Sequence, residues 1–441
     1  MMSEPMIRRS GHPMTVPEEE IGISVYWTKD VQGIGGRLKL EPEDFVVEEE
    51  SIFPPEDAEG PITVAVVKHR NWEMNRLVRR LSANLRIGRG MVAFAGTKDK
   101  RSVATQLMTF HARQEDVVAM QIPDIEILRT YRSRNDTRLG ALIGNDFRIA
   151  VKEIDPNETD ERIAAVTAKV NELGGFPNFF GVQRFGVTRP ITHLIGKAMV
   201  RGDFEKAVML YLGEETEYEF DECKEARRFI SETRDFQKAL EIFPQTLTFE
   251  RMMLGHLSRN PDDFAGAIGT LPRNLVMMFV HAYQSFLFNR ILSLRIEADI
   301  PLDIAFEGDV ILPLDKNGLP DHRRYVRATS INIERVNEQI ANGRGFISGS
   351  LFGSNPAMAE GVMGEIERRV VKEEVLESED FIVTQLLEAS SKGMRRELIS
   401  PVKNLQHKVD GASASFSFGL NKGCYATSLL REYMKSPLIC Y

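Results

Sequence analysis

The sequence predicts an α+β protein of two or three domains, and three observations support this prediction. Strand-like segments surround one helix between residues 37 and 112, helix follows helix beyond Pro190, and strand character returns after about Pro401. The length of 441 residues also fits two or three domains. Apolar residues make up 42% of the chain and charged residues 27%, a globular composition that excludes collagens, coiled coils and disordered chains.

The N-terminal part of the chain is expected to form strands around one amphipathic helix. Runs of β-branched and aromatic residues predict strands at 45–47, 61–68, 91–95 and 102–110. Between the second and third of these, Met74, Leu77, Leu81 and Leu85 recur at helical spacing. We expect Asn71 to cap this helix and Gly88 to end it.

The rest of the chain divides into a helical stretch and a short return to strands. Helical periodicity predicts helices at 161–173, 204–212, 224–230, 275–296 and 332–342, with a β-like interruption at 305–314. A strand at 414–420 and a final helix at 427–434 follow. We therefore predict a catalytic domain built from residues 1–190 and 401–441, with an inserted domain at 191–400.

The absence of common catalytic and ligand-binding motifs argues against several classes of function. The chain has no GxGxxG, phosphate-loop, HExxH or GxSxG motif, and its eight histidines and three cysteines are dispersed. We therefore predict no metal site and no disulfide framework, in a reducing cytoplasm. No apolar run approaches the roughly 18 residues of a bilayer span, so we expect no membrane contact.

Basic residues concentrate in one segment of an otherwise acidic protein. The whole chain has a formal net charge of −8, yet residues 68–113 contain eleven Lys and Arg against Glu73 and Asp99. A solvated helix face is the common explanation of such a run. This density in an acidic protein favours instead an anionic ligand, with RNA ahead of small phosphates.

Two short motifs carry candidate chemistry. In AGTKDKRSVATQ, residues 95–106, Asp99 stands between Lys98 and Lys100. This is either a charged turn or a carboxylate that nearby cations keep ionised, available as a nucleophile or base. In NFFGVQRFG, residues 178–186, the aromatic pair forms either a core turn or a clamp for a splayed nucleobase.

These two motifs, together with PEDFVVEE at 42–49 and GCYATSLLRE at 423–432, occur in the order found in the TruD family of tRNA pseudouridine synthases. The chain resembles that family at both ends, and 281–290 and 346–353 are similar to its inserted domain. The resemblance implies a pseudouridine synthase catalytic domain with a mixed, largely antiparallel sheet and flanking helices, interrupted by a helix-rich α/β insertion. It also implies isomerisation of a tRNA uridine without a cofactor, with uridine 13 as the expected target and other uridines left open.

The resemblance assigns roles to individual positions. Asp99 matches the catalytic aspartate and Lys39 the basic residue that pairs with it. The residues that match the surroundings of the target uridine are Phe45, Asn178, Phe180, which would pack on the base, and Tyr425. Phe179 and Cys424 depart from the Tyr and Ser common in the family, without touching the proposed nucleophile. For RNA contacts we predict Arg76, Arg79, Arg80, Lys98, Lys100, Arg101 and Arg184.

Two alternatives stay open from the residues alone. One is a tRNA-binding chaperone that kept the fold and lost the reaction. The other is a small-molecule isomerase that uses Asp99 and its lysines on a phosphate-bearing substrate. The attack of Asp99 on C1′, its attack on C6, and a glycal route through C2′ all require the same carboxylate, and the sequence implies no oligomeric state.

Overall fold

The computed structural model describes residues 18–441, so the first 17 residues of the predicted 1–190 domain lie outside the described part. Its centre is a ten-stranded sheet in the order β6-β3-β5-β2-β7-β14-β13-β8, with β1 added beside β7 and β4 beside β5. The strands are β1 Gly35–Arg37, β2 Phe45–Ser51, β3 Ile62–Arg70, β4 Val92–Phe94, β5 Val103–Phe110, β6 Ile125–Ser133, β7 Leu142–Ile154, β8 Gly175–Pro177, β13 Ile399–Asp410 and β14 Ser413–Asn421.

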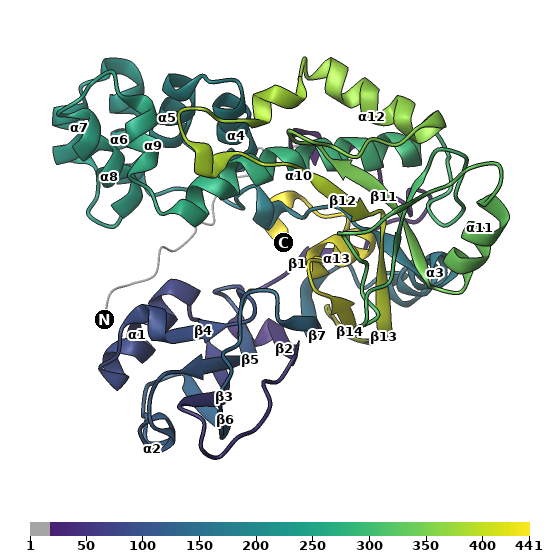
Figure 1. The fold of residues 1–441 in the computed structure, drawn as a ribbon, viewed down its shortest axis with the longest axis horizontal. Coiled ribbons are helices and arrows are strands. Elements are labelled where there is room, and N and C mark those ends of the chain that lie inside the picture. The colour runs from purple at the N-terminus through teal and green to yellow at the C-terminus, as the bar shows by residue number, and fades with distance from the viewer. Residues whose placement is uncertain (1–17) are drawn as a thin grey trace.

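The sheet is mixed but largely antiparallel, as the sequence implied. Strands β2 and β5 are parallel, with Val46 opposite Val103, and the other pairs in this sheet are antiparallel. Strand β7 lies in the middle, between β2 from early in the chain and β14 from its end. The β5, β3 and β6 end of the sheet lies apart from the β13 and β14 end (Figure 1).

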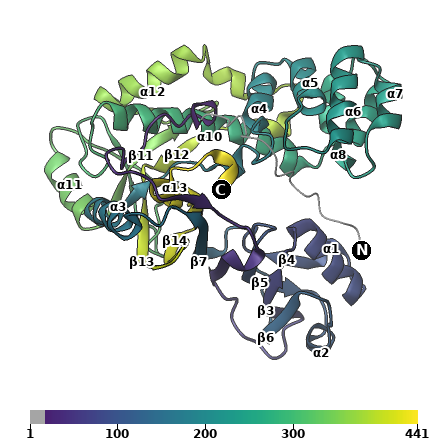
Figure 2. The same ribbon diagram turned by 180° about the vertical axis from the view of Figure 1, so that it is seen from behind.

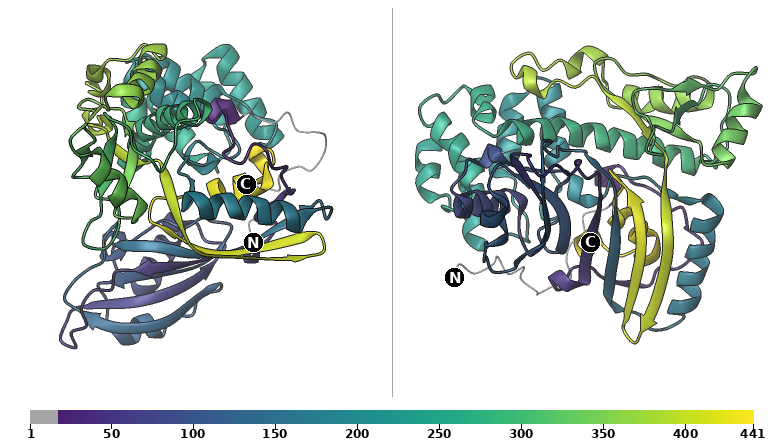
Figure 3. Two further views of the ribbon diagram at one scale, coloured as in Figure 1. Left: turned by 90° about the vertical axis from the view of Figure 1, so that its right-hand side faces the viewer. Right: turned by 60° about the horizontal axis from the view of Figure 1, so that its bottom comes forward.

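Helices cover this sheet in two places. Helix α1 (Met74–Leu85) packs through Leu77 and Leu81 against β3, β4 and β5, which confirms the predicted amphipathic pattern. Helices α3 (Thr159–Leu173) and α13 (Ala426–Met434) pack on β14, where Phe416 lies 4.9 Å from Tyr433 between ring centroids (Figure 3). The short helix α2 (Gln114–Val118) precedes β6.

The inserted segment contains most of the helices and a second sheet. Its helices are α4 Thr192–Val200, α5 Phe204–Gly213, α6 Asp221–Thr233, α7 Phe236–Ile242, α8 Thr248–Leu257, α9 Phe264–Gly269, α10 Arg273–Glu297, α11 Ile333–Ala341 and α12 Gly361–Glu373. Helix α10 contacts α4, α9, α12 and the second sheet, and it runs between the α5–α9 helices and the second sheet (Figures 1 and 2). The second sheet has the order β10-β9-β11-β12, formed by β9 Val310–Pro313, β10 Val326–Arg327, β11 Gly345–Leu351 and β12 Met394–Glu397.

The observed strands bear on the predicted domain division without fixing its exact limits. Strand β12 ends at Glu397 in the small sheet, and β13 begins at Ile399 in the large one. The large sheet therefore takes strands from both sides of the inserted segment, with β8 beside β13. The limits at 190 and 400 stay a prediction.

The ends predicted for the first helix were wrong. Glu73, not Asn71, caps α1, because its carboxylate accepts hydrogen bonds from the backbone N–H groups of Asn75 and Arg76. The helix ends at Leu85, where Arg86 takes the left-handed conformation with φ 55°, so Gly88 is not its stop. At the end of α3, Gly174 has φ 70° and confirms the predicted glycine stop.

Candidate active site

The loop that carries Asp99 connects β4 to β5 and is anchored by its neighbour Lys98. The Lys98 ammonium lies 2.5 Å from Glu49 Oε2 on β2, and the two side chains are only 4% and 0% exposed. Burial lowers the pKa of Lys98, and the pull of Glu49 opposes this effect. Because removing either charge leaves the other buried and unpaired, this pair ties the loop firmly to the sheet.

Two small residues complete the loop. A Cβ on Gly96 would lie 3.1 Å from Lys98 Nζ and 3.3 Å from Glu49 Oε2, so the buried ion pair leaves little room for a side chain there. On the other side of the turn, the Ser102 hydroxyl donates to the backbone carbonyl of Asp99 at 2.6 Å. The backbone at Asp99 is thereby held from both sides.

The carboxylate of Asp99 pairs with Lys39, as the resemblance implied. Lys39 Nζ lies 2.6 Å from Asp99 Oδ2, and the Asp99 side chain stays 41% exposed while that of Lys39 is 12% exposed. The same ammonium lies 4.4 Å from the ring centroid of Phe45, which is buried. Lys39 has φ 56°, a left-handed conformation that side chains other than Gly and Asn seldom adopt. Asp99, Lys39 and Phe45 thus form one cluster with an accessible carboxylate.

A second cluster surrounds Asn178, whose amide is fully engaged by the protein. Asn178 is completely buried, and its Nδ2 donates to Glu397 Oε1 at 3.0 Å and to the Glu397 carbonyl at 3.1 Å. Its Oδ1 accepts from Arg396 Nη2 at 2.6 Å. The structure therefore gives both ends of the Asn178 amide protein partners, and the place of Asn178 among the surroundings of the target uridine stays a prediction.

Phe180 is also more enclosed than the sequence suggested. It is 5% exposed, its ring meets Phe288 and Tyr425 edge-on, and the Arg396 guanidinium carbon lies 4.1 Å from its ring centroid. Its backbone N–H and carbonyl both bind the side-chain amide of Asn289 on α10. In this conformation the ring stacks on a guanidinium, so a base stacked on Phe180 would have to displace a neighbour.

Tyr425 opens α13 and lies beside Cys424. The Tyr425 residue is only partly buried and its ring centroid lies 5.9 Å from that of Phe180. Burial raises the pKa of the Cys424 thiol to about 12, which keeps it protonated near neutral pH. This agrees with assigning no catalytic role to Cys424.

Residues 140–143, at and just before the start of β7, contact the Asp99 loop and the turn before Tyr425. The backbone of Gly140 binds Ala95 in the Asp99 loop at 2.8 Å, and it also accepts from Lys422 Nζ at 2.9 Å. The N–H of Lys422 donates to the carbonyl of Ile143 at 2.9 Å, directly before Gly423 and Tyr425. Residues 140–143 therefore touch both the Asp99 loop and the turn that leads to Tyr425.

The predicted RNA contacts separate into exposed and buried side chains. Those exposed to solvent are Arg76, Arg79 and Arg80 on α1, with Lys100 and Arg101 in the Asp99 loop. Lys98 was predicted as an RNA contact, but it is buried against Glu49 and is unavailable to a phosphate in this structure. Arg184 is half-buried, donates to Ser285 at 3.1 Å and lies 5.5 Å from the Phe180 ring centroid.

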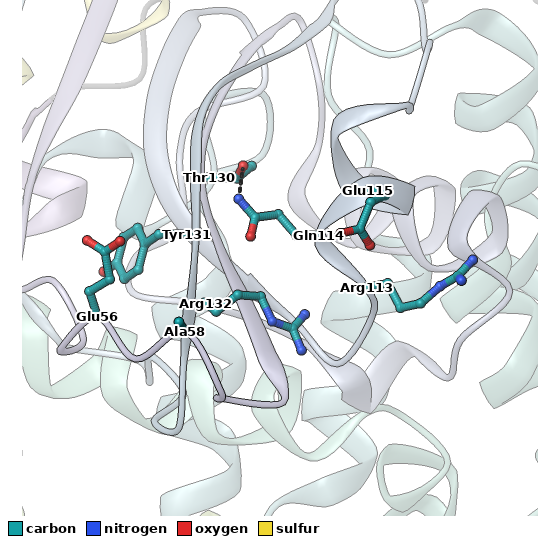
Figure 4. Close-up of a pocket in the computed structure, with 8 residues that line it drawn as sticks. All are labelled: Glu56, Ala58, Arg113, Gln114, Glu115, Thr130, Tyr131 and Arg132. Carbon is teal, nitrogen blue, oxygen red and sulfur yellow. Dashed lines mark hydrogen bonds between the residues drawn. The ribbon is translucent and has the colours of Figure 1, made fainter.

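Other cavities in the structure lie away from these side chains. One of about 440 Å³ is lined by residues of β6, α2 and the 56–58 loop, and Figure 4 shows Gln114 in it, donating to Thr130. Another of about 770 Å³ lies between α3, α11 and the ends of β13 and β14. Neither contains a predicted site residue. Within residues 18–441, His, Cys, Asp and Glu side chains form no group of three suited to a metal ion.

The sequence analysis missed several partners in the second cluster. Arg396 and Glu397 lie more than 200 positions after Asn178 along the chain, and Asn289 comes from the middle of α10. In sequence, Arg395, Arg396 and Glu397 have the appearance of an exposed charged stretch. Only the pairing of β12 with β11 places them inside the molecule.

Comparisons with known proteins agree on one family. A family model described as "tRNA pseudouridine synthase D (TruD)" matches residues 20–433. A relative from Methanosarcina mazei, named "Probable tRNA pseudouridine synthase D", is 43% identical over 96% of this chain and 99% of its own length. A relative of the same name from Thermococcus onnurineus is 39% identical over 91% of this chain and 95% of its own length.

A solved structure is similar as well. The crystal structure of the family member from Methanosarcina mazei superposes with a TM-score of 0.81 at 42% identity, covering 97% of this chain and 100% of that one. Separately, among residues 18–441 the structure has no helix of the length and apolarity that crossing a membrane requires.

Proposed function

Because the chain belongs to the TruD family of tRNA pseudouridine synthases, we propose that it converts uridine 13 of tRNA to pseudouridine with Asp99 as the catalytic carboxylate. The observation that supports this role is the Lys39–Asp99 ion pair, whose carboxylate remains 41% exposed. The carboxylate is thus held by a cation and is open to a nucleotide at the same time.

The proposed reaction is an isomerisation and needs no co-reactant. The N1–C1′ bond of the target uridine breaks and uracil departs with the electron pair. After the base turns, C5 bonds to C1′, the proton on C5 is lost and N1 takes up a proton, so atoms and charge balance. Asp99 either bonds to C1′ or C6 or removes a proton at C2′, and Lys39 holds it in place through their ion pair.

The target base must leave its stack before it can react, which costs a few kcal/mol. The exposed arginines of α1, with Lys100 and Arg101, would offset this cost through phosphate contacts. The pocket for the base would be formed or supported by Phe45, Asn178, Phe180 and Tyr425. We further propose a cytoplasmic location, because tRNA is the substrate.

The test is direct. Purified protein is incubated with an unmodified tRNA transcript, and pseudouridine is mapped by carbodiimide modification and primer extension. We expect one stop, at position 13, and none in a transcript with cytidine at that position. Modification at another uridine would refute uridine 13 as the target but would still support the isomerase activity. Binding of tRNA without any pseudouridine would favour the silent chaperone, and absence of both would favour the small-molecule isomerase.

A further inference from the structure

Arg396 on β12 is a buried cation without a carboxylate partner. Its residue is 7% exposed, and its hydrogen bonds go to neutral acceptors: Nε to the Asn178 carbonyl, and Nη2 to Asn178 Oδ1 and the Gly423 carbonyl. In the described part of the chain no Asp or Glu forms an ion pair with it. A buried charge without a counter-ion costs several kcal/mol, so its presence needs an explanation.

The preceding residue shows what a purely structural arginine looks like in this fold. Arg395 is 2% exposed, and its Nη1 lies 2.6 Å from Glu367 Oε1 and donates to the Ala357 carbonyl at 2.9 Å. Its charge is neutralised inside the protein. The two arginines occupy adjacent positions of one strand, so the lack of a counter-ion at Arg396 is specific to its side of the sheet.

Glu397 reaches Arg396 only through the amide of Asn178. Asn178 accepts from Arg396 on one side and donates to Glu397 Oε1 on the other. The second oxygen, Oε2, is buried without a hydrogen bond and lies 3.8 Å from His322 Nε2. These contacts fix the orientation of the Arg396 guanidinium without neutralising its positive charge.

The remaining nitrogen of the Arg396 guanidinium is Nη1. Within residues 18–441, Nη1 of Arg396 makes no hydrogen bond. It also keeps some exposure to solvent, unlike the fully buried polar atoms that lack a partner. It lies beside Gly423, where a Cβ would come 3.9 Å from it, and the guanidinium rests over the ring of Phe180. Lys422, next to Gly423, donates its backbone N–H to Ile143, and Gly140 donates to Ala95 in the Asp99 loop, so residues 140–143 connect the turn beside Nη1 to the loop of the candidate active site.

We propose that Arg396 Nη1 donates to an anionic oxygen of the target nucleotide, an inference that rests on the proposed function. When the N1–C1′ bond breaks, the electron pair left on uracil spreads from N1 onto the two carbonyl oxygens. A preorganised donor aimed at such an oxygen stabilises the transition state more than the ground state. A phosphate oxygen beside the nucleotide has the same chemistry but carries its charge from the start. Asn178 and Glu397 act as positioning residues for this guanidinium.

Two variants test the proposal with separate readouts. Arg396→Gln keeps a hydrogen-bond donor for Asn178 and removes the charge. We measure its tRNA dissociation constant and its single-turnover rate of pseudouridine formation. A rate lower by about 10²–10³-fold with unchanged affinity, the loss typical of a missing oxyanion donor, assigns the contact to the base. A dissociation constant raised about tenfold or more with a retained rate assigns it to a phosphate.

The proposal is overturned if the folded variant keeps both the rate and the affinity within twofold of the wild type. Thermal unfolding establishes folding. If Arg396→Gln does not fold, Arg396→Lys takes its place with the same readouts, since a single ammonium nitrogen cannot occupy the positions of both Nη2, which binds Asn178, and Nη1. Arg369→Gln, at an exposed residue of α12 paired with Glu373, is the matched control and should change neither value. If the wild type forms no pseudouridine, the proposed function fails, whereas an active Arg396→Gln ends only this inference.

Discussion

Lys39 and Asp99 are 60 positions apart in sequence, yet their ammonium nitrogen and carboxylate oxygen lie 2.6 Å apart. The loop before β2 and the turn before β5 are brought together because these two strands are parallel neighbours. The pair is also tied by Arg101, which donates to the carbonyl of Leu40, next to Lys39. The proposed catalytic carboxylate is thus positioned by the sheet itself.

Lys39→Asn should lower the single-turnover rate of pseudouridine formation by at least about tenfold, with a smaller change in tRNA affinity, because one charge partner is worth on the order of 1–2 kcal/mol. Asparagine is chosen because it tolerates the left-handed backbone at this position. Lys408→Ala, at an exposed residue of β13, is the control. An unchanged rate for the folded Lys39 variant would show that the ion pair has no part in the reaction.

Arg79→Glu combined with Arg80→Glu should weaken tRNA binding and reduce the slope of log affinity against log salt by about one for every phosphate that the protein no longer neutralises. Both arginines are exposed on α1, opposite the face that packs on the sheet. The measurement is a filter-binding titration between 50 and 200 mM salt, roughly the range over which such slopes are resolved. The same reversal at Arg368 and Arg369 on α12 is the control. Equal slopes for both double variants and the wild type would show that tRNA does not bind the exposed face of α1.

Lys98→Met should lower the free energy of unfolding by about 3–5 kcal/mol, because it leaves Glu49 as a buried, unpaired charge. Adding Glu49→Gln removes that charge and keeps an acceptor for Ser51, which donates to Glu49 at 2.7 Å. The double variant should therefore regain most of the loss in denaturant unfolding. If the double variant is as unstable as the single one, the ion pair does not anchor the loop.

Local patterns in the sequence were sufficient for some of these features and not for others. The periodicity of Met74, Leu77 and Leu81 was sufficient to predict α1, since a helix buries one face through local spacing. Motif order was sufficient to pair Lys39 with Asp99 and to imply the mixed sheet. The burial of Lys98 could not be foreseen, because its partner Glu49 lies 49 positions earlier, on a strand whose pairing no local pattern specifies.

The same limit applies to the second cluster. Asn178 belongs to a recognisable motif, but its partners Arg396 and Glu397 come from a strand of the other sheet, near the end of the inserted segment. Residues that pack across such distances leave no periodic signal. The role of Arg396 therefore follows from its contacts in the fold and not from its place in the sequence.

Acid should destabilise the protein in part through His69. This residue on β3 is 1% exposed, neither ring nitrogen has a hydrogen bond, and burial, with a further contribution from Lys98, lowers its pKa to about 4. In the unfolded chain the imidazole takes up a proton near pH 6.5, and in the folded protein only near pH 4. The stability contributed by neutral His69 is therefore complete above pH 6.5 and is lost as the pH falls toward 4.

His69→Leu should reduce this dependence. Between about pH 7.5 and 4.5 the wild type should lose about 1–3 kcal/mol more unfolding free energy than the variant. Urea unfolding at the two pH values measures the difference. His193, which burial shifts in the same direction, contributes equally to both proteins and cancels. Identical losses in the two proteins would contradict the assignment to His69.

The central claim is that the Asp99 carboxylate performs the isomerisation, and Asp99→Asn tests it most directly. The change removes the negative charge and keeps nearly the same shape, so the loop, still held by Lys98 and Glu49, should persist. Release of tritium from uracil C5 in tRNA, measured under single-turnover conditions alongside tRNA binding, should fall to background while affinity stays within about twofold of the wild type. Tritium release at the wild-type rate by the folded Asp99→Asn protein would contradict the account.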